Sequence, residues 1–144
     1  MCGIAGFTGD IGQGAEKRLE AMNASLLHRG PDDQAIILLD KNGSQCGGET
    51  PPAAGLAHRR LSIIDLSDAG RQPMANEDES VWIVYNGECY NFQSLVTNLM
   101  SSGHRFRSRS DTEALIHGYE EWGIHGLLSR LNGMFAFAIW DQKQ

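Results

Sequence analysis

Apolar residues recur at helical spacing in four segments of this chain, with polar residues between them. The segments cover residues 15–28, 92–103, 115–122 and 124–131. Gly103 closes the second segment and Gly123 separates the third from the fourth, and glycine is a common residue at helix ends. The pattern therefore predicts three amphipathic helices and a short fourth helix directly after Gly123.

Five further segments are short and apolar, and they are rich in the β-branched and aromatic residues typical of strands. They cover residues 3–7, 35–39, 56–64, 81–85 and 134–140. Several of them are apolar on both faces, so their sheets need cover on two sides. We expect an α+β fold in which two face-to-face sheets lie between helices, a four-layer α/β/β/α sandwich. A single sheet covered by helices fits the same periodicity.

The composition indicates one soluble globular domain, or part of one, and excludes several classes of partner. The 144 residues are 41% hydrophobic and 21% charged, and no apolar run approaches the roughly 20 residues that span a bilayer. The formal charge of −6 offers no net attraction to nucleic acid or anionic lipid. We therefore expect no nucleic acid and no membrane partner, and we favour a small molecule or a protein.

The cysteines and histidines give no signal for a metal site or a disulfide framework. Cys2, Cys46 and Cys89 are an odd number without C-x-x-C spacing. The spacings of the five histidines match no common ligand motif, so we expect them to be structural and we assign no metal ligand. A reducing, cytoplasmic location fits this cysteine usage, and the N-terminus carries no recognisable targeting segment.

The last predicted strand stops four residues before the end of the chain. Its outer edge must be free, covered by an earlier segment, or paired with residues outside residues 1–144. We therefore expect residues 1–144 to form a single domain that is incomplete at its C-terminus.

Cys2 directly follows the initiator methionine, and its small side chain permits removal of that methionine. The new first residue would carry a thiol and an α-amino group together. Because α-amino groups titrate at about 7.7 to 8.0, the amine can serve near neutrality as the base for its own thiol. Position alone favours a simpler interpretation, a small buried residue that begins a strand.

Seven sequence blocks carry a family resemblance. They are MCGIAGF, HRGPDD, LAHRRLSIIDLS, RQPM, YNGECYNF, SDTEAL and NGMFAFAIWD, beginning at residues 1, 28, 56, 71, 85, 110 and 132. In this order they resemble the glutaminase domain of glutamine-dependent asparagine synthetases, which are class II glutamine amidotransferases and N-terminal nucleophile hydrolases. The resemblance covers nearly the whole chain. It implies antiparallel sheets and an enzyme that hydrolyses the side-chain amide of glutamine to glutamate and ammonia.

The resemblance also implies which residues carry the chemistry. Cys2 matches the nucleophile that attacks the amide carbonyl. Asn86 and Gly87 match the pair of N–H donors that stabilises the oxyanion, with a side-chain NH₂ from Asn86 and a backbone N–H from Gly87. Taken without the resemblance, an Asn-Gly dipeptide more often forms a tight turn.

The remaining site residues would hold the ends of the free amino acid. Arg60 matches the ligand of the substrate carboxylate, whereas Arg59 does not, and strand alternation would place these two side chains on opposite faces. Asp111 is the first candidate for the substrate ammonium and Glu88 the second. In a second set of contacts, backbone groups around Leu61 and Ile63 resemble additional substrate ligands.

Asp111 also has a structural explanation. Residues 110–113 read S-x-x-E, which predicts a capping box that opens the third helix. An aspartate in a first helical turn is common because it complements the helix dipole. Without the resemblance, the two interpretations of Asp111 are evenly balanced.

The resemblance places the ammonia acceptor outside this chain. In asparagine synthetases a C-terminal synthetase domain uses ATP and Mg²⁺, and a separate synthetase partner would serve the same purpose. We expect no cofactor in residues 1–144, and a homodimer is compatible with the resemblance. Two alternatives stay open: a non-catalytic fragment of the same fold that binds glutamine or a protein, and an amidotransferase that serves a different acceptor.

Overall fold

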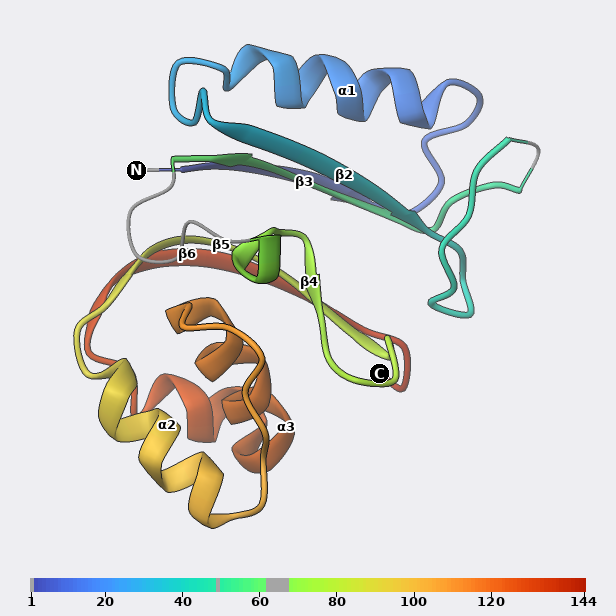
Figure 1. Cartoon of the computed structure of the whole chain (residues 1–144). Helices are drawn as coiled ribbons and strands as arrows, with labels where there is room; N and C mark the ends of the chain where they lie inside the picture. Colours follow the sequence, from blue (N-terminus) through green and yellow to red (C-terminus); the bar gives the residue numbers. More distant parts are fainter. Residues whose placement is uncertain (1, 49, 62–67) are drawn as a thin grey trace.

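The chain folds into four layers in a computed structural model that describes residues 2–48, 50–61 and 68–144. Two three-stranded antiparallel sheets lie face to face, with one helix outside the first sheet and two helices outside the second (Figure 1). The predicted α/β/β/α sandwich is therefore confirmed, and the single-sheet alternative is wrong.

The first sheet has strand order β1-β3-β2, comprising β1 (Gly3–Thr8), β3 (Ala54–Arg60) and β2 (Asp33–Leu39). Helix α1 (Ala15–Ser25) covers its outer face, where Leu19 packs against apolar side chains of β2 and β3. The helix ends three residues before the predicted end near residue 28. Strand β3 begins two residues before its predicted start, and residues 62–64 of the predicted strand lie outside the described residues.

The second sheet has strand order β4-β5-β6, comprising β4 (Met74–Ala75), β5 (Val81–Cys89) and β6 (Gly133–Asp141). Helices α2 (Phe92–Ser101) and α3 (Asp111–Leu128) cover its outer face. Strand β5 continues four residues past its predicted end. The periodicity did not predict β4 or the short 3₁₀ helix η1 (Asp68–Gly70), because elements of two or three residues are too short to show a period.

Helix α3 is broken where the sequence predicts a boundary. Gly123 has φ 67° and ψ 176°, a conformation that glycine tolerates and other residues rarely adopt, so the predicted third and fourth helices meet there at a kink. No helix in the described part of the chain combines the length and the apolar character needed to cross a bilayer.

Side-chain alternation along β3 and β5 determines what lies between the sheets. Leu56 on β3 and Trp82 and Val84 on β5 pack in the space between the sheets, whereas Ile83 and Tyr85 face α2 and α3. Further along the same inner faces, the alternation places polar side chains instead of apolar ones. Among the described residues, this polar end of the interface includes His58 and Arg60 on β3 and Asn86 on β5.

Candidate active site

Cys2 lies directly opposite Arg60 at one end of the first sheet. The β1–β3 register pairs Gly3 with Arg59, so its next pair is Cys2 with Arg60. Opposite residues of antiparallel strands project from the same face, here the one that Ile4 and Leu56 present to the second sheet. Cys2 is partly buried, and its Sγ lies 3.4 Å from the backbone N of Leu61, which donates to it, and 3.7 Å from the Leu61 carbonyl oxygen.

The two neighbouring arginines diverge as the sequence predicts. Arg59 Nε donates a hydrogen bond to the Asn23 carbonyl oxygen on α1 at 3.0 Å, so this side chain lies on the outer face of the sheet. Arg60 has the opposite orientation and is only 8% exposed. Arg60 is therefore the arginine that faces the second sheet.

His58 joins the two sheets beside Arg60. Its ring, which is 1% exposed, interacts with the backbone of Tyr85 on β5. Burial is the main cause that lowers the pKa of His58 to about 4, so the imidazole is neutral at physiological pH. Because His58 lies two residues from Arg60, and Tyr85 is adjacent to Asn86, this contact brings the guanidinium and Asn86 to the same end of the interface.

Asn86 and Gly87 lie within a strand. They pair with Ala136 and Phe135 of β6, so the tight-turn interpretation of this dipeptide is wrong. Asn86 has the parity of Val84, which directs its side chain between the sheets. Its Oδ1 is buried and has no hydrogen-bond partner among the described residues.

The backbone N–H of Gly87 points away from β6. On either side of it along β5, the N–H of Tyr85 donates to Gln72 Oε1 at 2.6 Å and the N–H of Cys89 donates to Asp111 Oδ2 at 3.0 Å. Alternate N–H groups of a strand point to the same edge, so the N–H of Gly87 points to that edge between these two bonds. A Cβ at position 87 would clash with the β6 backbone, 2.6 Å from Phe135 Cα, so glycine is required for the close approach of the strands.

Asp111 lies at the same edge of β5, at the start of α3. It is 5% exposed, and its Oδ2 accepts hydrogen bonds from the Tyr85 hydroxyl and the Cys89 N–H, both at 3.0 Å. Its Oδ1 receives no hydrogen bond from the described residues. Burial, and then the charge of Asp111, raise the pKa of Tyr85 well above its usual value. Gly87 and Cys89 are two residues apart, so the carboxylate lies about 7 Å along the strand from the Gly87 N–H.

The capping box at this helix start is only half confirmed. Ser110 is the N-cap, and its side chain accepts a hydrogen bond from Thr112 N at 3.2 Å. Glu113 does not return to the Ser110 backbone. Its carboxylate instead accepts hydrogen bonds from the backbone N–H groups of Arg107 and Ser108, both at 2.7 Å. The local S-x-x-E pattern could not reveal this loop, because the competing donors become available only in the folded chain.

The other predicted substrate contacts are Glu88 and the backbone groups around Leu61 and Ile63. Glu88 has the parity of Asn86 but is exposed. The backbone N–H and carbonyl of Leu61 are both in contact with Cys2 Sγ. Ile63 lies outside the described residues.

Gln72 is a residue to which the sequence motifs assigned no role. It is buried, its Oε1 accepts the Tyr85 N–H bond, and its Nε2 donates to Thr112 Oγ1 at 3.1 Å. Gln72 thereby fixes the edge of β5 against the first turn of α3, which orients Asp111. The available signal was the RQPM block itself, which contains this glutamine.

Comparison with known proteins matches this chain to one family. The family model described as "Glutamine amidotransferase domain" matches residues 1–144. The chain is 39% identical over 148 residues to asparagine synthetase [glutamine-hydrolyzing] 3 of Bacillus subtilis (strain 168) and 39% identical over 145 residues to asparagine synthetase [glutamine-hydrolyzing] 2 of Oryza sativa subsp. japonica. These alignments cover 100% and 99% of this chain and 22% of each relative, so the chain spans about a fifth of their length.

A solved structure supports the fold. The glutamine phosphoribosylpyrophosphate amidotransferase from B. subtilis superimposes with a TM-score of 0.77 at 20% sequence identity, over 99% of this chain and 35% of that one. At this identity the likeness supports the shared sandwich architecture.

Proposed function

Because this chain belongs to the glutamine amidotransferase domain family, we propose that it hydrolyses the side-chain amide of glutamine to glutamate and ammonia. The observation that carries the proposal is the convergence of groups at one end of the two sheets. Cys2 and Arg60 are opposite each other on the first sheet, and the alternation along β5 directs the Asn86 side chain toward that sheet. The Gly87 N–H and Asp111 lie along the adjacent edge of β5.

The proposed reaction begins after removal of Met1. The freed α-amino group takes the thiol proton of Cys2, and the sulfur attacks the amide carbon of glutamine. The side-chain NH₂ of Asn86 and the N–H of Gly87 stabilise the resulting oxyanion, and each such donor contributes about 3 kcal/mol in comparable enzymes. Ammonia leaves with the proton that the amine returns, and water then hydrolyses the thioester to release glutamate and regenerate the thiol.

Two charged side chains are proposed to hold the amino-acid end of the substrate. The guanidinium of Arg60 presents a planar pair of donors to the α-carboxylate. Oδ1 of Asp111 accepts the α-ammonium, while Oδ2 stays bonded to β5. The separation of about 7 Å between the Gly87 N–H and this carboxylate suits an extended glutamine side chain. The exposed Glu88 and the backbone near Ile63 are secondary candidates for the same end of the substrate.

We propose that the ammonia serves amide synthesis, most directly that of asparagine. The names of the relatives support this destination. The relatives themselves are far longer than this chain, which covers 22% of each. The acceptor, ATP and Mg²⁺ would bind to a synthetase domain or to a separate synthetase partner outside residues 1–144. Residues 1–144 would then act as the glutaminase domain.

Intact-mass analysis combined with a glutamate-release assay tests the nucleophile. Protein that lacks Met1 should hydrolyse glutamine, whereas Cys2→Ala and protein that retains Met1 should not. Cys46→Ala is the matched control, because Cys46 is also a partly buried free cysteine but packs with Leu19 and Leu38 on the outer face of the first sheet. Turnover by Cys2→Ala would refute the proposed nucleophile, and inactivity of every form would favour a non-catalytic glutamine-binding domain.

The paired arginines test how the substrate is held. Arg60→Ala should raise KM for glutamine roughly ten- to a hundredfold, the effect of losing a charge-assisted hydrogen bond of about 1.5 to 3 kcal/mol. Arg59→Ala should leave KM unchanged, because that side chain bonds to α1. An equal effect of both substitutions would exclude a specific contact between Arg60 and the substrate.

A further inference from the structure

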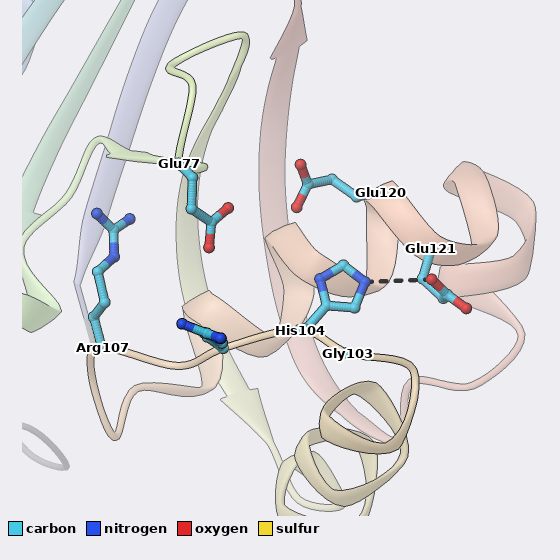
Figure 2. Close-up of a pocket in the computed structure, with 7 residues that line it drawn as sticks. Glu77, Gly103, His104, Arg107, Glu120 and Glu121 are labelled. Carbon is cyan, nitrogen blue, oxygen red and sulfur yellow. Dashed lines mark hydrogen bonds and ion pairs between the residues drawn. The ribbon is translucent and has the colours of Figure 1, made fainter.

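A second cluster of titratable side chains surrounds a surface pocket of about 510 Å³, nearly two helical turns beyond Asp111 on α3. The charged and titratable residues that line it are Glu77, His104, Arg105, Arg107, Glu120 and Glu121. Figure 2 shows Glu77 from the β4–β5 turn and Glu120 from α3 around the ring of His104, which lies on the loop between α2 and α3. His117, only 1% exposed, contacts this group from within α3.

Three donor atoms of this cluster converge on one point. His117 Nδ1 lies 3.3 Å from His104 Nδ1 and 3.0 Å from Glu120 Oε2, and all three ligand atoms lie within 4.8 Å of one another. Four donors held tetrahedrally at about 2.0 Å from Zn²⁺ are about 3.3 Å apart. The observed separations therefore match two edges of a tetrahedral coordination sphere.

We propose that His104 Nδ1, His117 Nδ1 and a carboxylate oxygen of Glu120 bind one divalent transition-metal ion of the Zn²⁺ class. Imidazole and carboxylate donors suit Zn²⁺ and Co²⁺ better than Mg²⁺ or Ca²⁺, which prefer oxygen ligands alone. Three protein ligands leave a fourth position, which opens to the pocket and accommodates water. The ion would fasten the loop between α2 and α3 to the middle of α3.

The outer nitrogens of both imidazoles face carboxylates, as in metal sites whose histidines are oriented by a second shell. His104 Nε2 lies 3.3 Å from Glu121 Oε2, and Figure 2 marks this contact. His117 Nε2 is buried without a hydrogen-bond partner among the described residues, and Glu77 Oε1 and Glu113 Oε1 lie 3.7 and 3.8 Å away.

The proton on His117 Nδ1 cannot satisfy both of its neighbours. A single N–H donates well to Glu120 or to His104, whereas a metal ion in its place would bond to all three groups at once. The charge balance favours the same occupant. Four carboxylates, those of Glu77, Glu113, Glu120 and Glu121, surround the guanidiniums of Arg105 and Arg107 and the His117 ring, and a divalent cation that replaces the His117 proton neutralises the negative charge that is left.

The test is a Co²⁺ titration of the full chain in a Cys2→Ala/Cys46→Ala background, which removes the two cysteine thiols that are not buried. When Co²⁺ is added to the metal-free protein, the intense visible absorption of tetrahedral Co²⁺ should appear and should saturate at one ion per chain. Zn²⁺ should displace the Co²⁺, and Mg²⁺ should not. The affinity should fall at lower pH, because the metal replaces a proton on His117.

Four variants assign the binding to these residues. His104→Gln and Glu120→Gln should each weaken Co²⁺ binding at least tenfold, and Glu121→Gln should weaken it roughly tenfold or more by releasing the His104 ring. His125→Gln is the control, since His125 is an exposed histidine on the same helix, and its affinity should be unchanged. His117→Gln is avoided because this side chain is buried. Circular dichroism without metal confirms that each variant is folded.

Absence of a tetrahedral Co²⁺ spectrum would overturn the inference. So would equal affinities of His104→Gln, Glu120→Gln and the His125→Gln control, or displacement of Co²⁺ by Mg²⁺. None of these readouts depends on glutamine hydrolysis, so the metal site and the proposed function can fail independently.

Discussion

The charge on His117 should make the stability of this protein depend on pH above neutrality. Burial alone would lower the pKa of His117, but the carboxylates of Glu113, Glu120 and Glu77 outweigh burial and raise its pKa from 6.5 to about 9. In an unfolded chain the ring would titrate near 6.5. The folded state therefore binds the proton more tightly than the unfolded state.

The direction of the effect follows from this linkage. Because the pKa is higher in the folded state, the contribution of His117 is complete below about pH 6.5 and is lost as the pH rises through 9. A shift of this size corresponds to about 3 kcal/mol, at about 1.4 kcal/mol per pH unit. For a chain of this length, that loss lowers Tm by roughly 6 to 12 °C.

A separate effect limits stability in acid. Burial tends to raise the pKa of Glu113, but the nearby His117 ring and hydrogen bonds from Ser108 and Arg107 lower it from 4.5 to about 2. The contribution of Glu113 is thus present above about pH 4.5 and is lost as the pH falls through 2. Part of it is the same interaction with His117, so the two contributions do not add.

Denaturant unfolding followed by circular dichroism from pH 6 to 10, with a chelator present to keep metal ions away, measures the predicted fall. His117→Gln should abolish this fall, and His125→Gln should retain it because that side chain is exposed. Titration of the His117 ring by NMR gives the pKa directly, even if the variant is too unstable to compare. A free energy of unfolding that stays level between pH 6.5 and 9, or a ring that titrates near 6.5, would refute the reasoning.

Two further predictions concern the edge of β5. Gly87→Ala should lower the free energy of unfolding by about 1 to 3 kcal/mol, because the added Cβ would overlap the β6 backbone at Met134; an unchanged urea midpoint would contradict this close approach. Asp111→Ala should lower the free energy of unfolding by roughly 2 to 6 kcal/mol, since the Tyr85 hydroxyl and the Cys89 N–H both lose their acceptor. In urea unfolding, Asp111→Ala should cost less when Tyr85 is already replaced by Phe, and additive effects of the two substitutions would argue against the bond.

The local sequence determined the helices and strands in which apolar residues repeat at a regular spacing. The helical spacing of apolar residues located α1, α2 and α3, and Gly123 located the kink in α3. Strand alternation by itself separated Arg59 from Arg60. These features follow from the 3.6- and 2-residue periods of the backbone, which a single chain segment already contains.

The family resemblance supplied the candidate site residues, but the tertiary structure decided how they are arranged. Asn86 and Gly87 lie in an extended strand instead of a turn because β6, about fifty residues later in the chain, pairs with them. Asp111 meets the Cys89 N–H for a similar reason, since β4 is too short to cover that edge of β5.

The cluster around His117 shows the same division. His104 and His117 are separated by 13 residues, a spacing that matches no common ligand motif. Their ring nitrogens meet because α2 and α3 pack on one sheet face and the connecting loop returns across α3. Contacts between segments depend on how whole elements pack, whereas periodicity reports only which face of each element is apolar. The sequence therefore determined the helices and the strand faces. The tertiary structure decided which distant polar groups meet.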